Sequence, residues 1–134
     1  IRELTKVHEI LDGFKVDDFS FEPIGYSVNA LKDNYYFTIH VTPQDISPYV
    51  SFETNMVDGG KAQQVLSAVI EAFRPRSFDV VFFETHNVQE NFDMPSYERR
   101  SQVQHTFDCG YTVQYGHFSQ NQIACHSAFE LEIP

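Results

Sequence analysis

The sequence predicts an α+β fold in which an antiparallel or mixed sheet carries helices on one face. Segments that alternate apolar and polar residues recur along the chain, as half-buried strands require. Residues 61–73 differ, because their apolar side chains follow a helical spacing. With 134 residues and 42% hydrophobic content, the chain can bury one core, so we expect residues 1–134 to form a single domain.

The first half of the chain predicts a short helix followed by strands. Residues 1–11 place apolar side chains at helical spacing, and Gly13 provides a stop signal. Residues 14–22 alternate phenylalanine with polar neighbours and therefore favour a strand. Residues 34–42 are rich in β-branched and aromatic side chains and give the strongest strand signal, and residues 49–53 repeat the alternation.

Period two divides the strand at 34–42 into an apolar and a polar face. The apolar face has Tyr35, Phe37, Ile39 and Val41, and the polar face has Tyr36, Thr38, His40 and Thr42. His40 is therefore expected on the polar side of the sheet.

The middle of the chain predicts a helix, a buried strand and a loop. The helix at 61–73 should end before Pro75 and lie on the sheet. Residues 78–84 form a nearly continuous apolar run, which is typical of a central strand covered on both sides. Residues 85–100 are polar and interrupted by proline, so we expect an exposed loop.

The end of the chain predicts a hairpin. Residues 103–109 and 111–118 are strand-like and meet at Gly110, which suits a tight turn. Residues 123–133 permit one further strand or an ordered tail.

Charge and hydropathy exclude several classes of protein. Nineteen acidic against nine basic side chains give a formal charge of −10, which repels a phosphate backbone and argues against nucleic-acid binding. A cationic small molecule would be attracted instead. The sequence has no apolar run of the roughly 18 residues that a membrane span needs and no signal-peptide pattern, so we expect a cytoplasmic protein without a membrane partner.

Cysteine and histidine patterns indicate neither a disulfide nor a metal site. Cys109 and Cys125 are most simply reduced thiols, and we expect Cys109 to be a small buried hydrophobic residue. His105, His117 and His126 are not clustered as metal ligands are, so we predict no metal.

Three blocks in the first half of the chain resemble a known family. Residues 25–30, 38–43 and 49–55 read GYSVNA, TIHVTP and YVSFETN. Their order and spacing resemble the signature blocks of eukaryotic-type S-adenosylmethionine decarboxylase, and the similarity runs from Ile1 to about Phe83. Three blocks in register are far more specific than a single motif.

The resemblance implies a half of a larger enzyme. The family builds a four-layer αββα sandwich from two similar halves, and this chain is similar to the second repeat, the carboxy-terminal half. The enzyme, a carboxy-lyase, cleaves itself at an internal serine to form a pyruvoyl group, which holds S-adenosylmethionine as a Schiff base while carbon dioxide leaves. The product serves spermidine and spermine synthesis. The pyruvoyl group and the acid cysteine belong to the other half, which would be this chain's partner.

The resemblance assigns roles to individual residues. His40 matches the histidine that removes a proton during self-processing, and Ser27 matches a serine that hydrogen-bonds near the pyruvoyl group. Phe21 matches one of two phenylalanines that stack on the adenine in the family. From the residues alone, His40 is equally a strand histidine bonded within a sheet, Ser27 a turn serine and Phe21 a core side chain.

Three further positions concern putrescine and ribose. Glu53 and Phe83 resemble residues that line the buried putrescine site of some family members, where carboxylates bind the diammonium ion. Gln44 departs from the family, which has a glutamate that accepts hydrogen bonds from the ribose hydroxyls. An amide keeps one acceptor oxygen but loses the charge that strengthens such bonds about twofold.

Three hypotheses follow for the function. The first is a functional decarboxylase half that works with its pyruvoyl-bearing partner, because Phe21, Ser27 and His40 all match in register. The second is a catalytically inactive regulatory paralogue that activates a decarboxylase, which Gln44 supports. The third is an interaction domain that retains only the fold. Putrescine activation and a dimeric assembly are left open.

Overall fold

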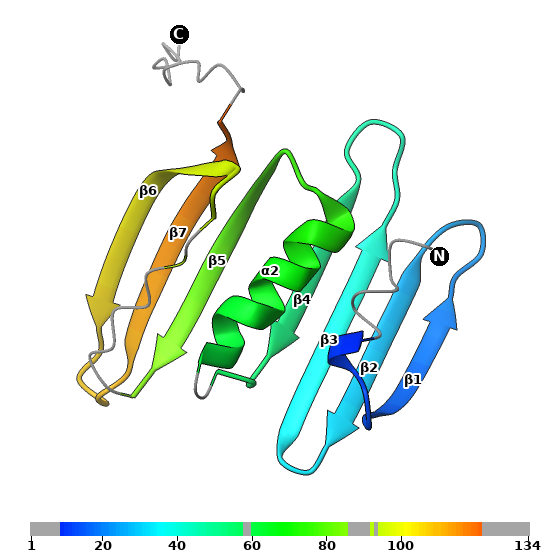
Figure 1. The fold of residues 1–134 in the computed structure, drawn as a ribbon, viewed down its shortest axis with the longest axis horizontal. Helices are drawn as coiled ribbons and strands as arrows, with labels where there is room; N and C mark the ends of the chain where they lie inside the picture. The colour runs from blue at the N-terminus through cyan, green and yellow to red at the C-terminus, as the bar shows by residue number, and fades with distance from the viewer. Residues whose placement is uncertain (1–8, 58–59, 86–91, 93, 122–134) are drawn as a thin grey trace, which may run out of the picture. The chain divides into compact units, whose positions relative to one another are not determined.

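The computed structural model of the protein describes residues 9–57, 60–85, 92 and 94–121. The chain divides into two compact units, Ile1–Arg74 and Pro75–Pro134. Figure 1 shows their helices and strands. All strand pairs in these ranges are antiparallel, so the predicted α+β class with an antiparallel sheet is confirmed.

The described residues of the first unit contain a four-stranded antiparallel meander and the helix α2 (Lys61–Phe73), which follows it. Its strands β1 (Lys15–Ser20), β2 (Tyr26–Lys32), β3 (Tyr35–Thr42) and β4 (Tyr49–Thr54) pair in chain order. The predictions of strands at 14–22, 34–42 and 49–53 are confirmed. Sequence reasoning did not identify β2, because its polar and small residues are weak strand formers. Pairing with a neighbour on each side determines its conformation instead.

The helix α2 (Lys61–Phe73) confirms the periodicity-based prediction. It begins after Gly60, whose φ of 81° is readily adopted by glycine. It ends at Phe73 and is capped by Arg74, whose amide N–H donates to the Ile70 carbonyl oxygen at 2.8 Å. Pro75 then prevents continuation. The buried stripe of the helix consists of Ala62, Val65, Leu66, Val69 and Ala72.

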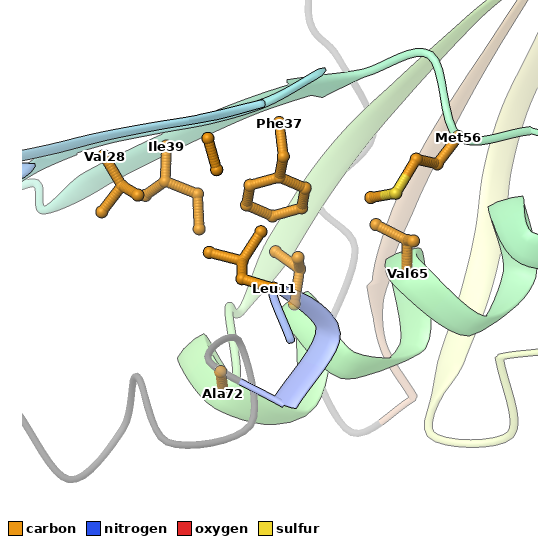
Figure 2. Close-up of a cluster of buried hydrophobic side chains, with 9 residues drawn as sticks. Leu11, Val28, Phe37, Ile39, Met56, Val65 and Ala72 are labelled. Carbon is orange, nitrogen blue, oxygen red and sulfur yellow. The ribbon is translucent and has the colours of Figure 1, made fainter. Parts of the chain in front are cut away.

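The core of the first unit lies between this helix and one face of the sheet. Phe37 and Ile39 are fully buried, and Figure 2 shows their side chains pointing from β3 toward the side chains of Val65 and Leu11. Leu11 follows the helical residues Glu9 and Ile10, and the rest of the predicted helix at 1–11 lies outside the described residues. The buried members of the core are Leu11, Val28, Ala30, Phe37, Ile39, Met56, Val65, Val69 and Ala72.

The second unit is a three-stranded antiparallel sheet in the order β5 (Ser77–Glu84), β7 (Thr112–Gln120), β6 (Tyr97–Thr106). The predicted hairpin is confirmed and has longer arms. Its turn contains Gly110 with a φ of 90° and is closed by a hydrogen bond from the Phe107 N–H to the Tyr111 carbonyl oxygen at 2.8 Å.

Two predictions for the second unit are wrong. β5 is an edge strand of its described sheet, because β7 occupies the central position. It is also not covered on both faces, since Val81 is 51% exposed and Phe83 is 67% exposed. The expected loop at 85–100 ends early, since β6 begins at Tyr97, whose hydroxyl donates to the Pro75 carbonyl oxygen at 2.7 Å. Pairing with β7 therefore outweighs the polar composition.

Other predictions fall on parts that are not described. Residues 86–91 of the expected loop and residues 123–133, the expected last strand or tail, lie outside the described residues. Within the described ranges, no helix has the length and apolar character needed to cross a membrane.

Candidate functional site

The face of the four-stranded sheet opposite the core carries the candidate site. Alternation along β2 and β3 turns Val28, Ala30, Phe37 and Ile39 to the core and their neighbours to the other side. We call this other side the outer face. Strand register places two rows of residues across it: Phe19, Ser27, His40 and Ser51 in one, and Asp17, Asn29, Thr38 and Glu53 in the next.

The side chains of Ser27 and His40 are in contact on the outer face. They are direct partners in the register of β2 and β3, and Ser27 Oγ lies 2.8 Å from His40 Nδ1. A side-chain hydrogen bond of this length orients the imidazole ring. The bond uses Nδ1, so Nε2 can face a reacting group. A hydroxyl beside an imidazole is an arrangement suited to proton transfer near neutral pH.

Phe21 lies in the turn of the first hairpin, two positions after Phe19, the register partner of Ser27. The Phe21 N–H donates to the Gly25 carbonyl oxygen at 2.9 Å and closes the turn that joins β1 to β2. The ring lies against Gly25, where an added Cβ would be 3.3 Å from Phe21 Cβ. Glycine is required there, since its φ is also +152°. Phe21 is 49% exposed, so it is not the core side chain that periodicity alone permitted.

A hydrogen bond from Tyr26 joins the two strands of the same hairpin on the core side of the sheet. The Tyr26 hydroxyl donates to Asp18 Oδ2 at 2.7 Å, which ties β2 to the edge strand β1. Burial raises the pKa of Tyr26 to about 12, and the hydrogen bond and negative charge of Asp18 act in the same direction. Sequence reasoning missed this contact, because a tyrosine and an aspartate eight positions apart carry no recognisable signal.

The remaining predicted site residues are more dispersed. Gln44 is exposed just after β3, and its N–H donates to the Thr42 carbonyl oxygen at 3.0 Å. Glu53 is exposed on the outer face, opposite Thr38 and one row from His40. Phe83 belongs to the second unit, where it is 67% exposed. A common putrescine site for Glu53 and Phe83 therefore stays a prediction.

The second unit has a polar cluster that sequence reasoning also missed. Asp79 Oδ1 accepts a hydrogen bond from the Tyr115 hydroxyl at 2.8 Å and lies 2.7 Å from His117 Nδ1. Partial burial opposes ionisation of Asp79, but its hydrogen bonds with His117 and Tyr115 outweigh burial, so the pKa of Asp79 is lowered. Asp79 and His117 are direct partners on β5 and β7, although 38 positions separate them.

The cysteine that the structure describes, Cys109, differs from its prediction. Cys109 is an exposed free thiol, so the prediction of a buried side chain is wrong, because the residue lies in the hairpin turn rather than in a strand. Cys125 and His126 lie outside the described residues. In the part of the chain that the structure describes, His, Cys, Asp and Glu form no group of three or more that could hold a metal ion.

The fold and the site together define a class of protein: a layered α+β unit that carries a hydroxyl–imidazole pair on the outer face of its antiparallel sheet. A model of the adenosylmethionine decarboxylase family matches residues 1–119. The chain belongs to this family.

Relatives with known names agree with this assignment. The chain is 36% identical over 121 residues to an S-adenosylmethionine decarboxylase proenzyme of Dictyostelium discoideum, covering 85% of this chain and 32% of the relative. A Drosophila melanogaster proenzyme is 42% identical over 78 residues, which are 58% of this chain and 22% of that protein. The chain thus spans about a third or less of the length of these two relatives.

A solved structure supports the fold. The chain is similar to a Trypanosoma brucei AdoMetDC-delta26 monomer, with a TM-score of 0.79 and 26% sequence identity. The match covers 90% of this chain and 52% of the other. The fold of this chain therefore corresponds to about half of the Trypanosoma brucei chain.

Proposed function

We propose that the chain is the substrate-binding and proton-handling half of a pyruvoyl-dependent S-adenosylmethionine decarboxylase in the cytoplasm. The reaction releases carbon dioxide and forms the aminopropyl donor for spermidine and spermine. The observation that carries this proposal is the 2.8 Å contact between Ser27 Oγ and His40 Nδ1 on the outer face of the sheet. Membership of the family, with a match over residues 1–119, supports it.

The chain's own residues have two tasks in this proposal. His40 takes a proton during self-processing, and Ser27 holds the imidazole so that Nε2 meets that proton. Phe21 offers a half-exposed ring to the adenine and to the nearby sulfonium, both of which favour aromatic surfaces. The net charge of −10 also attracts a cationic substrate.

The pyruvoyl group would come from the partner polypeptide segment. When present, it provides the electron sink for loss of carbon dioxide. The residues beside it fit a polar carbonyl group, because a serine hydroxyl and an imidazole stand together on an exposed sheet face. The exposed carboxylate of Glu53, one row from His40, supports a role for Glu53 in binding a cation such as putrescine.

Self-cleavage of the full-length polypeptide tests the proposal. Intact mass should reveal a fragment whose amino terminus is a pyruvoyl group and reacts with hydroxylamine. The variant His40→Gln should remain unprocessed or stop at an ester, whereas the matched control Thr38→Val, on the same face of the same strand, should process normally. Absence of any pyruvoyl-bearing fragment from the unmodified protein, or normal processing of His40→Gln, would contradict the proposal.

A regulatory paralogue is the second candidate function. Gln44 favours it, because an amide at this position weakens the hydrogen bonds proposed for the ribose hydroxyls. A paralogue would lack the pyruvoyl group in the full-length polypeptide yet raise the activity of an active decarboxylase mixed with it.

The role of Gln44 itself can be measured. If the site binds the ribose, Gln44→Glu should tighten binding of an adenine nucleoside by a few fold, since a charged acceptor forms the stronger bond. Isothermal titration calorimetry with 5′-methylthioadenosine measures this change. Equal affinities for the two forms would remove Gln44 from the binding site.

A further inference from the structure

The second unit has a polar cluster, Asp79, Tyr115 and His117, that the proposed function does not use. Strands β5 and β7 present it on one face of the three-stranded sheet (Figure 1), since Asp79 and His117 are register partners and Tyr115 lies two positions from His117. The side chains of Asp79 and His117 are 58% and 35% exposed. A group outside the sheet can therefore reach both of them.

The hydrogen bonds inside the cluster converge on one oxygen atom. Asp79 Oδ1 accepts from the Tyr115 hydroxyl at 2.8 Å and lies 2.7 Å from His117 Nδ1, whereas no donor among the described residues reaches Asp79 Oδ2. The two oxygens of an ionised carboxylate accept about four hydrogen bonds in all. Asp79 therefore has an unused acceptor oxygen.

The same hydrogen bonds determine which nitrogen of His117 carries a proton. Although burial opposes ionisation, hydrogen bonds with His117 and Tyr115 lower the pKa of Asp79, so the carboxylate is charged at neutral pH. A charged carboxylate only accepts hydrogen bonds, and His117 Nδ1 must therefore be the donor. In the neutral imidazole this assigns the lone pair to Nε2, which is a second unused acceptor.

A guanidinium group matches two acceptors on neighbouring side chains. Its N–H donors lie in one plane and form paired, parallel hydrogen bonds, here to Asp79 Oδ2 and His117 Nε2, and its charge strengthens both bonds. An ammonium group is a compact point charge and lacks this planar fork. A carboxylate or phosphate does not fit, because it would meet the charge of Asp79 without offering a donor.

The next row of the same face offers apolar surface beside these acceptors. Tyr115 pairs with Val81 on one side and with Val103 on the other, and the two valines are 51% and 61% exposed. The methylene groups that carry a guanidinium bury well along such a surface while the charged end stays at the polar row. The row therefore favours a guanidinium on an aliphatic chain over the bare ion.

We propose that Asp79 and His117 form a binding site for a guanidinium group carried on an aliphatic chain. This inference goes beyond the proposed function, because the site belongs to the second unit and takes no part in proton transfer at His40. Two sources can supply the group: an arginine side chain from another segment of the longer polypeptide, or a small guanidino compound. The first source arises because the chain covers only 32% of the Dictyostelium discoideum relative.

Binding of butylguanidinium to the full-length polypeptide tests for the small-molecule source. Isothermal titration calorimetry should show binding that Asp79→Asn weakens about tenfold, the loss expected for one charge-assisted hydrogen bond. Butylammonium has the same chain and charge and should bind at least about threefold more weakly. Asp108→Asn is the matched control, because it removes an exposed carboxylate from the hairpin turn of the same unit, and it should bind as the unmodified protein does.

Phenylglyoxal, which modifies arginine side chains, tests for the other source in the same polypeptide. If an arginine outside residues 1–134 occupies the site, peptide mapping by mass spectrometry should find it protected in the unmodified protein. It should react about tenfold faster in Asp79→Asn but not in Asp108→Asn. Butylguanidinium should then bind only after that arginine is replaced by alanine.

Either pattern supports the site and identifies the source of its ligand. His117→Phe lacks the Nε2 acceptor, so it should show the same losses and replaces Asp79→Asn in both assays if that variant does not fold. The inference is overturned if butylguanidinium does not bind and no arginine gains reactivity, if Asp79→Asn binds as tightly as the unmodified protein, or if butylammonium binds equally well. None of these measurements involves decarboxylation or self-cleavage, so such a failure leaves the proposed function intact.

Discussion

Replacement of Tyr26 by phenylalanine tests how the hairpin beside Ser27 is held in place. The hydroxyl donates to Asp18 at 2.7 Å, and the pKa of Tyr26 is raised from 10.0 to about 12 by burial, then by the hydrogen bond and charge of Asp18. A shift of about two units corresponds to at most ~2.7 kcal/mol. The pair is near the surface, so solvent screening reduces this, and we expect Tyr26→Phe to cost about 1 kcal/mol at pH 7.

The cost should depend on pH in a defined direction. The folded-state pKa of Tyr26 lies above the unfolded value, so the stabilisation is complete below the unfolded pKa of 10.0 and is lost as pH rises toward the folded value of about 12. The stability difference between the native protein and Tyr26→Phe should therefore be constant up to about pH 9 and shrink above about pH 10.

Urea denaturation of both proteins at several pH values measures this difference. Tyr49→Phe is a suitable control, because the Tyr49 side chain is 64% exposed on β4 and should lose no stability with its hydroxyl. Other groups titrate at high pH, but they do so in both proteins and cancel in the difference. A difference below about 0.3 kcal/mol at pH 7, or one that is unchanged at about pH 11, would refute the reasoning.

Three further predictions concern the core, the turn and the second unit. Phe37→Ala should lower the free energy of unfolding by about 3–5 kcal/mol, because the ring is fully buried at 0% exposure; a loss below about 1.5 kcal/mol in denaturant titration would contradict the assigned core. Gly25→Ala should weaken 5′-methylthioadenosine severalfold in calorimetry, because the new Cβ meets Phe21 at 3.3 Å in a strained φ of +152°; unchanged affinity would show that the position of the Phe21 ring is irrelevant. Asp79→Asn should remove an acid-sensitive part of stability. The folded pKa of Asp79 is lowered, against the effect of burial, by its hydrogen bonds with His117 and Tyr115, so this stabilisation is present above the ordinary pKa of 3.8 and is lost as pH falls through the folded value. Acid titration curves of equal shape for the native protein and Asp79→Asn would contradict this account.

Much of the fold could be predicted from local pattern. The strand at 34–42 and the helix at 61–73 lie where alternation and helical spacing placed them, and His40 is on the polar face as expected. The errors in the strand assignments have one cause. Strand β2, the start of β6 and the edge position of β5 are decided by pairing between strands, and a single-sequence pattern contains no information about the partner.

The candidate site, like the fold, could be predicted from the sequence only in part. The motif resemblance named Ser27, His40 and Phe21, and the fold brings Ser27 and His40 into contact. It left open whether Phe21 is a core or an exposed side chain, because an alternating phenylalanine is equally consistent with both positions. The 49% exposure of Phe21 decides between them.

The sequence by itself determined which residues are apolar and with what period, and so determined the class of the fold, the helix and the face of β3 that carries His40. Only the tertiary structure decided that Ser27 lies beside His40, 13 positions away, and that Tyr26 reaches Asp18. The physical reason is that hydrophobic periodicity is a local property of the chain, whereas a hydrogen bond across strands depends on register. Register is set by the pairing of whole strands and the packing of their buried face.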